Sequence, residues 1–403
     1  MSDLVRDRLD LMPPASLRNI RVRSVVIGVV AFAIAIVGGF MQHDPVQFHR
    51  SYLLAWEMWN NVSLGCLALL MMQHLTGGRW AFVIRRPLEA ATRLFPLTAL
   101  LGVPVLLGMS HLYPWANADI RSHDEHLSHS VYLTTSGFVY RYIVYFVSWI
   151  VLAWFMNKYS ARQDTLDNRL AKQRLENTAG PGLVIYVLTA TFSSIDWLMS
   201  LTPNWSSTIY GFLLIAGQGL IAISFMIVVL VILEKYPPMN GILQARHFHD
   251  LGKLMLAFVM LWAYFSFSQL LLVWSGNLPE EISWYLHRMG GGWKWVDLAL
   301  ILFHFALPFV LLLSRDLKRA SRRLAILAVL MVGMRFVDLF WLVAPNPLPG
   351  KPQGTTLSWL DIMLTIGIGG LWMGAYFWQL SKRPLVPLYD PTYEEVVGHA
   401  GTP

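Results

Sequence analysis

The stretch from Thr191 to Gly217, TFSSIDWLMSLTPNWSSTIYGFLLIAG, holds a carboxylate, Asp196, inside one apolar run, and a very short turn separates that run from the next. Pro203 and Asn204 lie in the turn, which is typical of a tight link between two helices. An ionisable group inside a membrane-spanning helix is costly and usually has a function. The stretch therefore predicts two membrane helices with an acidic group facing the interior of a bundle.

Composition indicates that the whole chain is a polytopic membrane protein. Its 403 residues are 55% hydrophobic and 14% charged, and the mean hydropathy is +0.49. The single cysteine, Cys66, excludes an internal disulfide framework, an all-cysteine zinc site and a cysteine-ligated iron–sulfur cluster. No CxxCH motif for covalent haem c occurs. We attribute the net charge of +7 to loops facing anionic lipid and expect no nucleic-acid partner.

Apolar runs close to the length that a bilayer requires predict an all-α fold with ten transmembrane helices. The first is too long for a secretory signal and lacks its small-residue cleavage pattern, so we expect it to be retained. A cytoplasmic tail at 1–21, a membrane domain at 22–380 and a C-terminal arm at 381–403 follow from these limits. The runs are Val22–Met41, Ser51–Leu75, Leu94–Leu107, Val131–Met156, Gly180–Leu201, Ser206–Leu233, Leu251–Trp274, Trp295–Ser314, Leu324–Ala344 and Leu357–Leu380.

The distribution of basic residues predicts the orientation of these helices. Lys and Arg in or beside the connections number 23 on one side and 5 on the other. Cytoplasmic connections carry the excess of Lys and Arg, so we expect both termini in the cytoplasm and the chain in the cytoplasmic (inner) membrane. The histidine-rich connection from Ser110 to Ser130 then lies on the outer side.

Three further segments carry charge. Gly77 to Arg93 has Trp80, Phe82 and Leu88 among four arginines, which predicts a helix lying on the inner leaflet. Asn157 to Thr178 has mixed charge, which predicts a short solvated helix. The segment from Ser381 has four prolines and an acidic cluster, which predicts an extended arm, potentially on a neighbouring subunit.

Ionisable residues within the predicted helices cluster towards the outer side or the middle of the membrane. Arg335 and Asp338 are three residues apart, and Asp297 and His304 are seven apart, so each pair shares a helix face. Asp297 and Asp361 lie near span ends, where they could be hydrated. The group comprises Glu57, Arg141, Asp196, Asp297, His304, Arg335, Asp338 and Asp361.

Two interpretations of this cluster remain open. Arg141 and Arg335 could neutralise Glu57, Asp196 and Asp338 and so fasten helices together. Alternatively, these residues form a proton-conducting or quinol-facing polar cavity. In the second interpretation, Asp196, Asp338 and His304 form an outer-half proton relay tuned by the two arginines, with Asp338 the more firmly ionised and Asp196 the proton carrier.

The histidines do not predict a haem or metal site. Haem b needs histidines on facing helices at matched depth, whereas His74 is near an inner helix end and His304 is near the middle of another helix. The SHDEH segment, Ser122 to His126, could hold a metal, but a solvated loop is the simpler interpretation. Gly370 and Gly374 form a GxxxG pattern, which predicts close helix packing.

Several segments resemble a known family. They are DWLMSLTPNWSSTIYGFLLIAGQ (Asp196–Gln218), LGKLMLAFVMLWAYFSFSQLLLVWSGNLPEEISWY (Leu251–Tyr285), GGRW (Gly77–Trp80) and RRPLEAATRLFPL (Arg85–Leu97). Together they resemble the NrfD-like family (polysulfide reductase membrane subunits). Within that family they resemble the ActF branch, whose members are subunits of Alternative Complex III. The resemblance runs from about Gly77 to about Arg319.

The resemblance implies two central four-helix bundles, at about 51–201 and 206–344, and a set of partners. These are a paralogous NrfD-like quinol subunit, an iron–sulfur protein, haem c subunits and lipids. Quinol, haem c and iron–sulfur clusters would be the cofactors of that complex, and this chain would bear no redox centre. It would be a scaffold with a proton path in a quinol:cytochrome c or other quinol oxidoreductase. A quinol-binding anchor for an iron–sulfur subunit, a secondary transporter and a purely structural subunit remain alternatives.

Overall fold

The computed structural model describes residues 17–164, 168–352 and 354–387, and in these ranges the chain forms helices without a strand. The prediction of an all-α polytopic membrane protein is confirmed at this level. Within these described ranges, eight helices are long and apolar enough to cross a membrane. They are α2 (Leu17–Met41), α9 (Thr135–Arg162), α10 (Asn168–Trp197, continued by η2, Met199–Leu201), α11 (Tyr210–Leu233), α13 (Ala245–Gly276), the α15–η3–α16 run (Trp293–Leu313), α18 (Ser321–Val343) and α19 (Trp359–Leu380).

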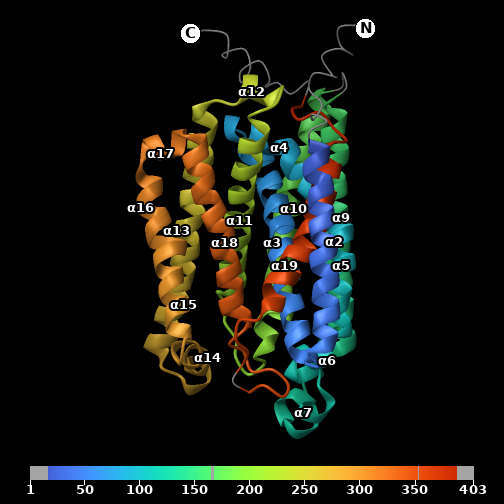
Figure 1. The fold of residues 1–403 in the computed structure, drawn as a ribbon, viewed down its shortest axis with the longest axis vertical. Helices are drawn as coiled ribbons and strands as arrows, with labels where there is room; N and C mark the ends of the chain where they lie inside the picture. Colours follow the sequence, from blue (N-terminus) through green and yellow to red (C-terminus); the bar gives the residue numbers. More distant parts are fainter. Residues whose placement is uncertain (1–16, 165–167, 353, 388–403) are drawn as a thin grey trace.

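The outer helices expose the apolar side chains that lipid would cover. Along α2, Val26, Ile27 and Val30 are each more than half exposed. A surface of this kind would be unusual on a soluble monomer, but it suits a bilayer. Exposed apolar side chains continue along α9 and α13, which lie on opposite sides of the bundle (Figure 1).

Two central helices organise the bundle. The first is α3 (Pro45–Thr76), which is buried along most of its length, and the second is α11. Both lie in the middle of the bundle, with α13, α15, α16 and α18 on one side and α2, α5, α9 and α19 on the other (Figure 1). Helix α11 packs against α3, α10, α13 and α18, and α3 also packs against α5, α10 and α19.

The glycines of α19 allow close packing against α2, as the GxxxG pattern predicts. A Cβ atom added to Gly370 would lie 2.4 Å from Cα of Gly28, and one added to Gly374 would lie 2.3 Å from a side-chain carbon of Val25. Neither distance is compatible with a real side chain. The two helices therefore approach at backbone distance along this face.

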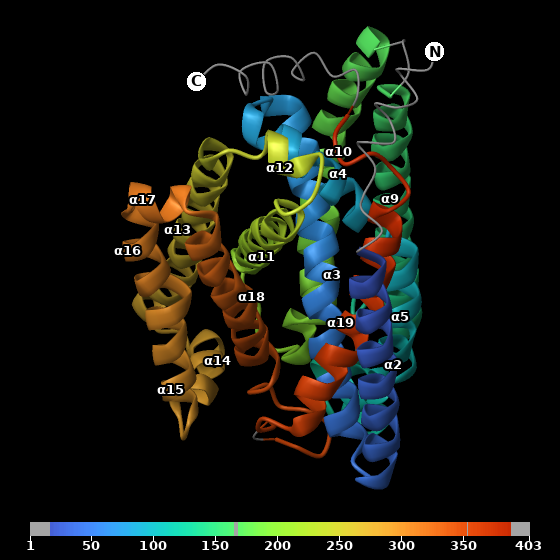
Figure 2. The same cartoon turned by 45° about the horizontal axis from the view of Figure 1, so that its top comes forward.

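The third predicted run, Leu94–Leu107, matches a helix in the structure, but the segment before it does not lie on the surface. Helices α4 (Arg79–Thr92) and α5 (Phe95–Leu107) form one pair bent by 44° at a short break. Every side chain from Ala81 to Thr92 is buried, because α4 packs against α3, α9, α11, α13 and α19. Figure 2 brings this end of the molecule forward and shows α4 beside α3.

The predicted solvated helix between Asn157 and Thr178 is also wrong as a separate element. Helix α9 continues to Arg162 and α10 already begins at Asn168, so these charged segments extend the two long helices. Several of their polar side chains, including Asn157 and Ser160, are buried against α4 rather than solvated.

Shorter helices complete the chain. They are α6 (Met109–Leu112), η1 (Pro114–Ala116), α7 (Ala118–His123), α8 (Glu125–Ser128), α12 (Met239–Ile242), α14 (Pro279–Met289) and α17 (Arg315–Arg319). The predicted tail at 1–21 lies mostly outside the described residues. The part of the predicted arm after Pro387 also lies outside the described residues. The part before it includes the buried residues Leu385 and Val386.

Helix α7 lies at one end of the bundle, and the start of α2 and the end of α19 lie at the other (Figure 1). We expect a cysteine replacing the exposed Ser122 of α7 to react with an impermeant maleimide added to the periplasmic side of intact cells. A cysteine replacing the exposed Gln173, at the opposite end, should react only after the cytoplasmic face is opened, and the native Cys66 is buried. The reverse pattern would show that the predicted orientation is wrong.

Candidate functional site

The centre of the bundle holds an ion pair on α18. Arg335 and Asp338 are both buried, and Arg335 Nη1 donates to the carboxylate of Asp338. The pairing expected from their spacing of three residues is therefore present. The indole nitrogen of Trp262, on α13, donates to the same carboxylate at 3.2 Å. The Asp338 carboxylate is thus held by a cation and a neutral donor from two helices.

Arg335 extends from α18 across a glycine of α11. A Cβ atom added to Gly217 would lie between 2.3 and 2.6 Å from the carbon and nitrogen atoms of the Arg335 guanidinium group. Any other residue at position 217 would therefore displace the arginine. Gly217 belongs to the segment Asp196–Gln218, and the close approach of Arg335 explains why that position holds a glycine.

The acid of α3, Glu57, lies in the charge field of Arg335 but forms no ion pair with any described residue. It is 2% exposed, its Oε2 atom has no well-aligned hydrogen-bond partner, and the neutral side chains of Asn60 and Asn61 act on the carboxyl group. Buried polar groups without partners are uncommon because each loses its hydration. On the next turn of α3, the side chains of Asn60 and Asn61 also carry buried polar atoms without a well-aligned hydrogen-bond partner.

His304 lies beside this group in an unusual backbone. Residues Leu300–Ala306 form a π-helix, η3, between α15 (Trp293–Ala299) and α16 (Leu307–Leu313). Pro308, the second residue after the π-helix, cannot donate a backbone hydrogen bond, which favours such a disturbance. The imidazole is fully buried and stacks on Trp262, with 4.2 Å between ring centroids and an angle of 2°. Short π-helical segments are often found at functional sites.

Asp196 belongs to a second polar group, between α9 and α10. Its carboxylate accepts hydrogen bonds from Arg141 Nε at 2.8 Å and Nη2 at 2.9 Å, and from the Tyr145 hydroxyl at 2.7 Å. The Arg141 guanidinium lies 3.9 Å from the ring centroid of Tyr132. Burial, together with the negative charge of Asp196, raises the pKa of Tyr132, a residue outside the membrane-spanning helices. Tyr132 therefore remains a neutral stacking partner.

The predicted relay residues thus form two groups. Within the described part of the chain, no hydrogen bond or ion pair joins Asp196 to Arg335, Asp338 or His304. The Tyr113 hydroxyl donates to the backbone oxygen of Trp197 at 3.1 Å, next to Asp196 in the chain. The bidentate ion pair fixes Asp196 more firmly than the sequence suggested.

The other two acids of the predicted cluster lie near helix ends. The sequence allowed Asp361 to be hydrated, but in the structure it is fully buried at the start of α19. It pairs with Arg50 at 2.8 Å and accepts the backbone N–H of Ser358. Asp297 is partly exposed, on α15. His304 lies within the π-helix Leu300–Ala306, so part of the chain that separates it from Asp297 is not α-helical, and the seven-residue spacing no longer places the two residues on one face.

Sequence reasoning missed the contributions of Trp262, Tyr145 and Arg50, since a hydrogen-bond partner 50 or more residues away leaves no local pattern. Tyr132 was missed as well, although it stacks on Arg141 only nine residues along the chain. It also missed a stacked pair of histidines, His49 and His111, whose ring centroids are 5.3 Å apart. Among the described residues, no group of three His, Cys, Asp or Glu side chains is placed to hold a metal ion.

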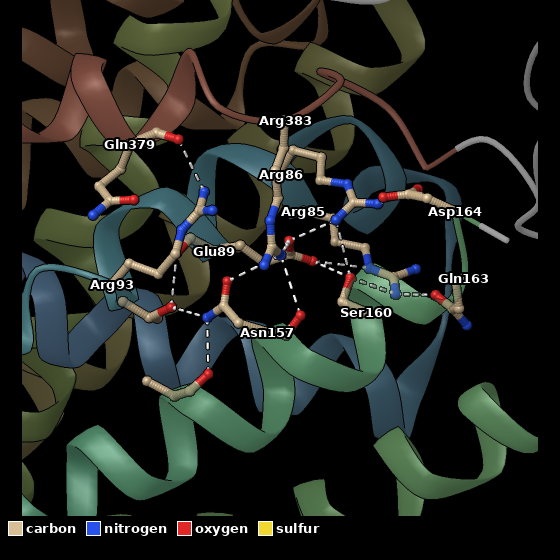
Figure 3. A network of polar contacts seen from close by, with 12 residues as sticks. Arg85, Arg86, Glu89, Arg93, Asn157, Ser160, Gln163, Asp164, Gln379 and Arg383 are labelled. Carbon is tan, nitrogen blue, oxygen red and sulfur yellow. Dashed lines mark hydrogen bonds and ion pairs between the residues drawn. The ribbon is translucent and has the colours of Figure 1, made fainter. Parts of the chain in front are cut away.

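A third set of ionisable residues joins α4 to α9 at the end of the bundle that holds the start of α2 and the end of α19 (Figure 3). Glu89 is fully buried, and its Oε2 atom lies 2.8 Å from Arg86 Nη1. Arg86 Nη2 also lies 2.5 Å from Asp164 Oδ1, and Ser160 donates to Glu89. This network explains why α4 is buried despite its charges: Arg85, Arg86 and Glu89 each meet a partner at the end of α9 or just after it.

No family model matches the chain, and no curated protein matches it.

Proposed function

We propose that the chain is an ActF-type membrane subunit of a quinol oxidoreductase of the Alternative Complex III type, in the NrfD-like family. The support is the resemblance of Asp196–Gln218 and Leu251–Tyr285 to that family, on an all-α multi-pass fold. In this assignment the subunit holds no redox centre. Electrons pass from quinol through the iron–sulfur and haem c partners to cytochrome c or another electron acceptor. A paralogous NrfD-like subunit lies in the same complex.

The proposed membrane domain has ten spans. The eight apolar helices supply eight of them, and the bent α4–α5 pair and the central α3 supply the other two. With 32 residues, α3 is long enough to cross a bilayer, and its polar side chains are buried rather than facing lipid. Two four-helix bundles then follow: α3, α4–α5, α9 and α10 form the first, and α11, α13, α15–α16 and α18 form the second.

The proposed role within the complex is a proton path along the buried acids. The observation that carries it is Glu57, a buried carboxyl group beside Arg335 and without an ion-pair partner of its own in the described part of the chain. Burial at low dielectric favours the neutral form of a carboxyl group, and a neutral carboxyl group can release and regain a proton. Asp338 and His304 extend the path on neighbouring helices, and Asp196 with Arg141 forms a separate group between α9 and α10.

The assignment to a complex is tested by mild solubilisation of native membranes containing the tagged chain, followed by native electrophoresis. We expect the chain to migrate with haem c and iron–sulfur subunits, far above its own 45.8 kDa. After the subunits are separated, the haem absorption should leave with the partners and the chain should be colourless. Migration of the chain alone would contradict the proposal and favour a transporter, whereas haem absorption retained by the chain would contradict its role as a subunit without a redox centre.

A further inference from the structure

A pocket lies between α5 and α9, at the end of the bundle that holds the start of α2 and the end of α19. Its volume is about 290 Å³. Three cationic side chains line it, from three different segments: Arg93 between α4 and α5, Lys158 on α9, and Arg383 after α19. Pro96, Ile150 and Trp154 form its apolar wall.

The network beside the pocket neutralises these three cations only in part, because it pairs Arg383 alone among them. The two nearby carboxylates, Glu89 and Asp164, already bind Arg86 at 2.8 and 2.5 Å. Arg383 reaches Glu89 only at 3.4 Å, and its other contacts are with Asn157. Figure 3 shows the Arg383 side chain entering this network from the segment after α19.

The other two cations of the pocket have no acidic partner in the described part of the chain. Arg93 Nη2 donates to the backbone oxygen of Gln379 at 3.2 Å, and its Nε is buried without a hydrogen-bond partner. Lys158 Nζ lies 4.2 Å from the ring centroid of Trp154. The pocket therefore carries an excess of positive charge, with donor groups free to bind an anion.

The apolar wall leads from the pocket onto a lipid-facing surface. Along α9, Val147, Val151 and Trp154 are exposed, and along α5 Leu100 and Leu107 are exposed. These rows run from the cationic end towards the middle of the membrane. Tryptophan and lysine together are typical of the interface between headgroups and acyl chains, where the lysine stem lies on apolar surface.

We infer that this pocket binds the phosphate of an anionic glycerophospholipid, with the acyl chains lying along α5 and α9. Basic pockets between membrane helices on the cytoplasmic side bind such headgroups. A soluble anion would use the cations equally well but would gain nothing from the exposed apolar rows. The inference requires only that the helices span a membrane, and it does not depend on the proposed complex.

The test uses the full-length protein, with any copurifying subunits, in nanodiscs of phosphatidylcholine with and without phosphatidylglycerol. Native mass spectrometry counts the phosphatidylglycerol that stays bound. The variant Arg93→Gln/Lys158→Gln should bind phosphatidylglycerol at least about tenfold more weakly, because each basic residue near a membrane surface adds to the attraction. Both residues are outside the Arg86–Glu89 pair, and the elution profile on gel filtration verifies folding.

The matched control is Lys172→Gln/Arg174→Gln, which removes two exposed charges from α10 at the same end of the bundle but outside the pocket. It should bind phosphatidylglycerol as the unaltered protein does. Equal binding by the pocket variant, or equal loss in the control, would overturn the site. Inorganic phosphate or ATP that binds in phosphatidylcholine discs and displaces phosphatidylglycerol would assign the pocket to a soluble anion and overturn the lipid.

Discussion

Replacing Arg335 by methionine should lower the free energy of unfolding by about 3–5 kcal/mol, the usual cost of leaving one member of a buried ion pair alone. The reason is that Asp338 is almost completely buried and has only the Trp262 indole as a further donor. We expect a large fall in the yield of folded protein, and a lower midpoint of thermal unfolding in detergent for the fraction that remains.

The double variant Arg335→Met/Asp338→Asn should recover most of this loss. Asparagine is neutral and its oxygen still accepts the Trp262 hydrogen bond, so no uncompensated charge remains. Arg322→Met, the same substitution at an exposed position of the same helix, should change stability by no more than about 0.5 kcal/mol. If the double variant is as unstable as Arg335→Met, the unpaired carboxylate is not the cause.

The ionic contacts differ in how far the sequence predicted them. The contact between Arg335 and Asp338 follows from their spacing, since residues three apart share a helix face. The contact between Arg141 and Asp196 does not, because it depends on which helices are neighbours. Composition therefore identified the buried ionisable residues, whereas their division into two groups, one around Arg335 and one around Asp196, required the packing of α9, α10 and α18.

Helix α4 shows why pattern alone was insufficient at the inner end. Four arginines interspersed with aromatic and aliphatic residues are typical of a helix on a membrane surface. The sequence does not reveal that α9 extends far enough to place Ser160 and Asp164 against Arg86 and Glu89. With these partners supplied, the helix is buried. The π-helix at His304 was equally hidden, because an apolar run of that length predicts a regular helix.

Glu57→Gln should remove proton translocation while leaving assembly and at least part of quinol oxidation intact, if the proposed proton path is correct. Glutamine keeps the shape of the side chain but cannot release a proton. The sequence alone favoured Asp196 as the carrier. However, Asp196 is held in place by two hydrogen bonds from Arg141 and one from Tyr145. Glu57 has no such cationic partner, so it is the acid better suited to exchange.

The measurement is the ratio of protons released to electrons transferred by the purified complex in proteoliposomes, followed with a pH-sensitive dye during quinol oxidation. We expect Glu57→Gln to reduce this ratio to that of quinol oxidation without translocation, and Glu57→Asp, which restores a titratable group, to recover part of the difference.

Asp196→Asn should weaken the link between α9 and α10 and lower stability, with the ratio unchanged in the complex that assembles. A reduced ratio in Asp196→Asn but not in Glu57→Gln would return the carrier role to Asp196. Unchanged ratios in both variants and in Asp338→Asn, with normal assembly and turnover, would mean that the buried acids only fasten the helices, because a proton path cannot lose every one of its titratable groups without effect.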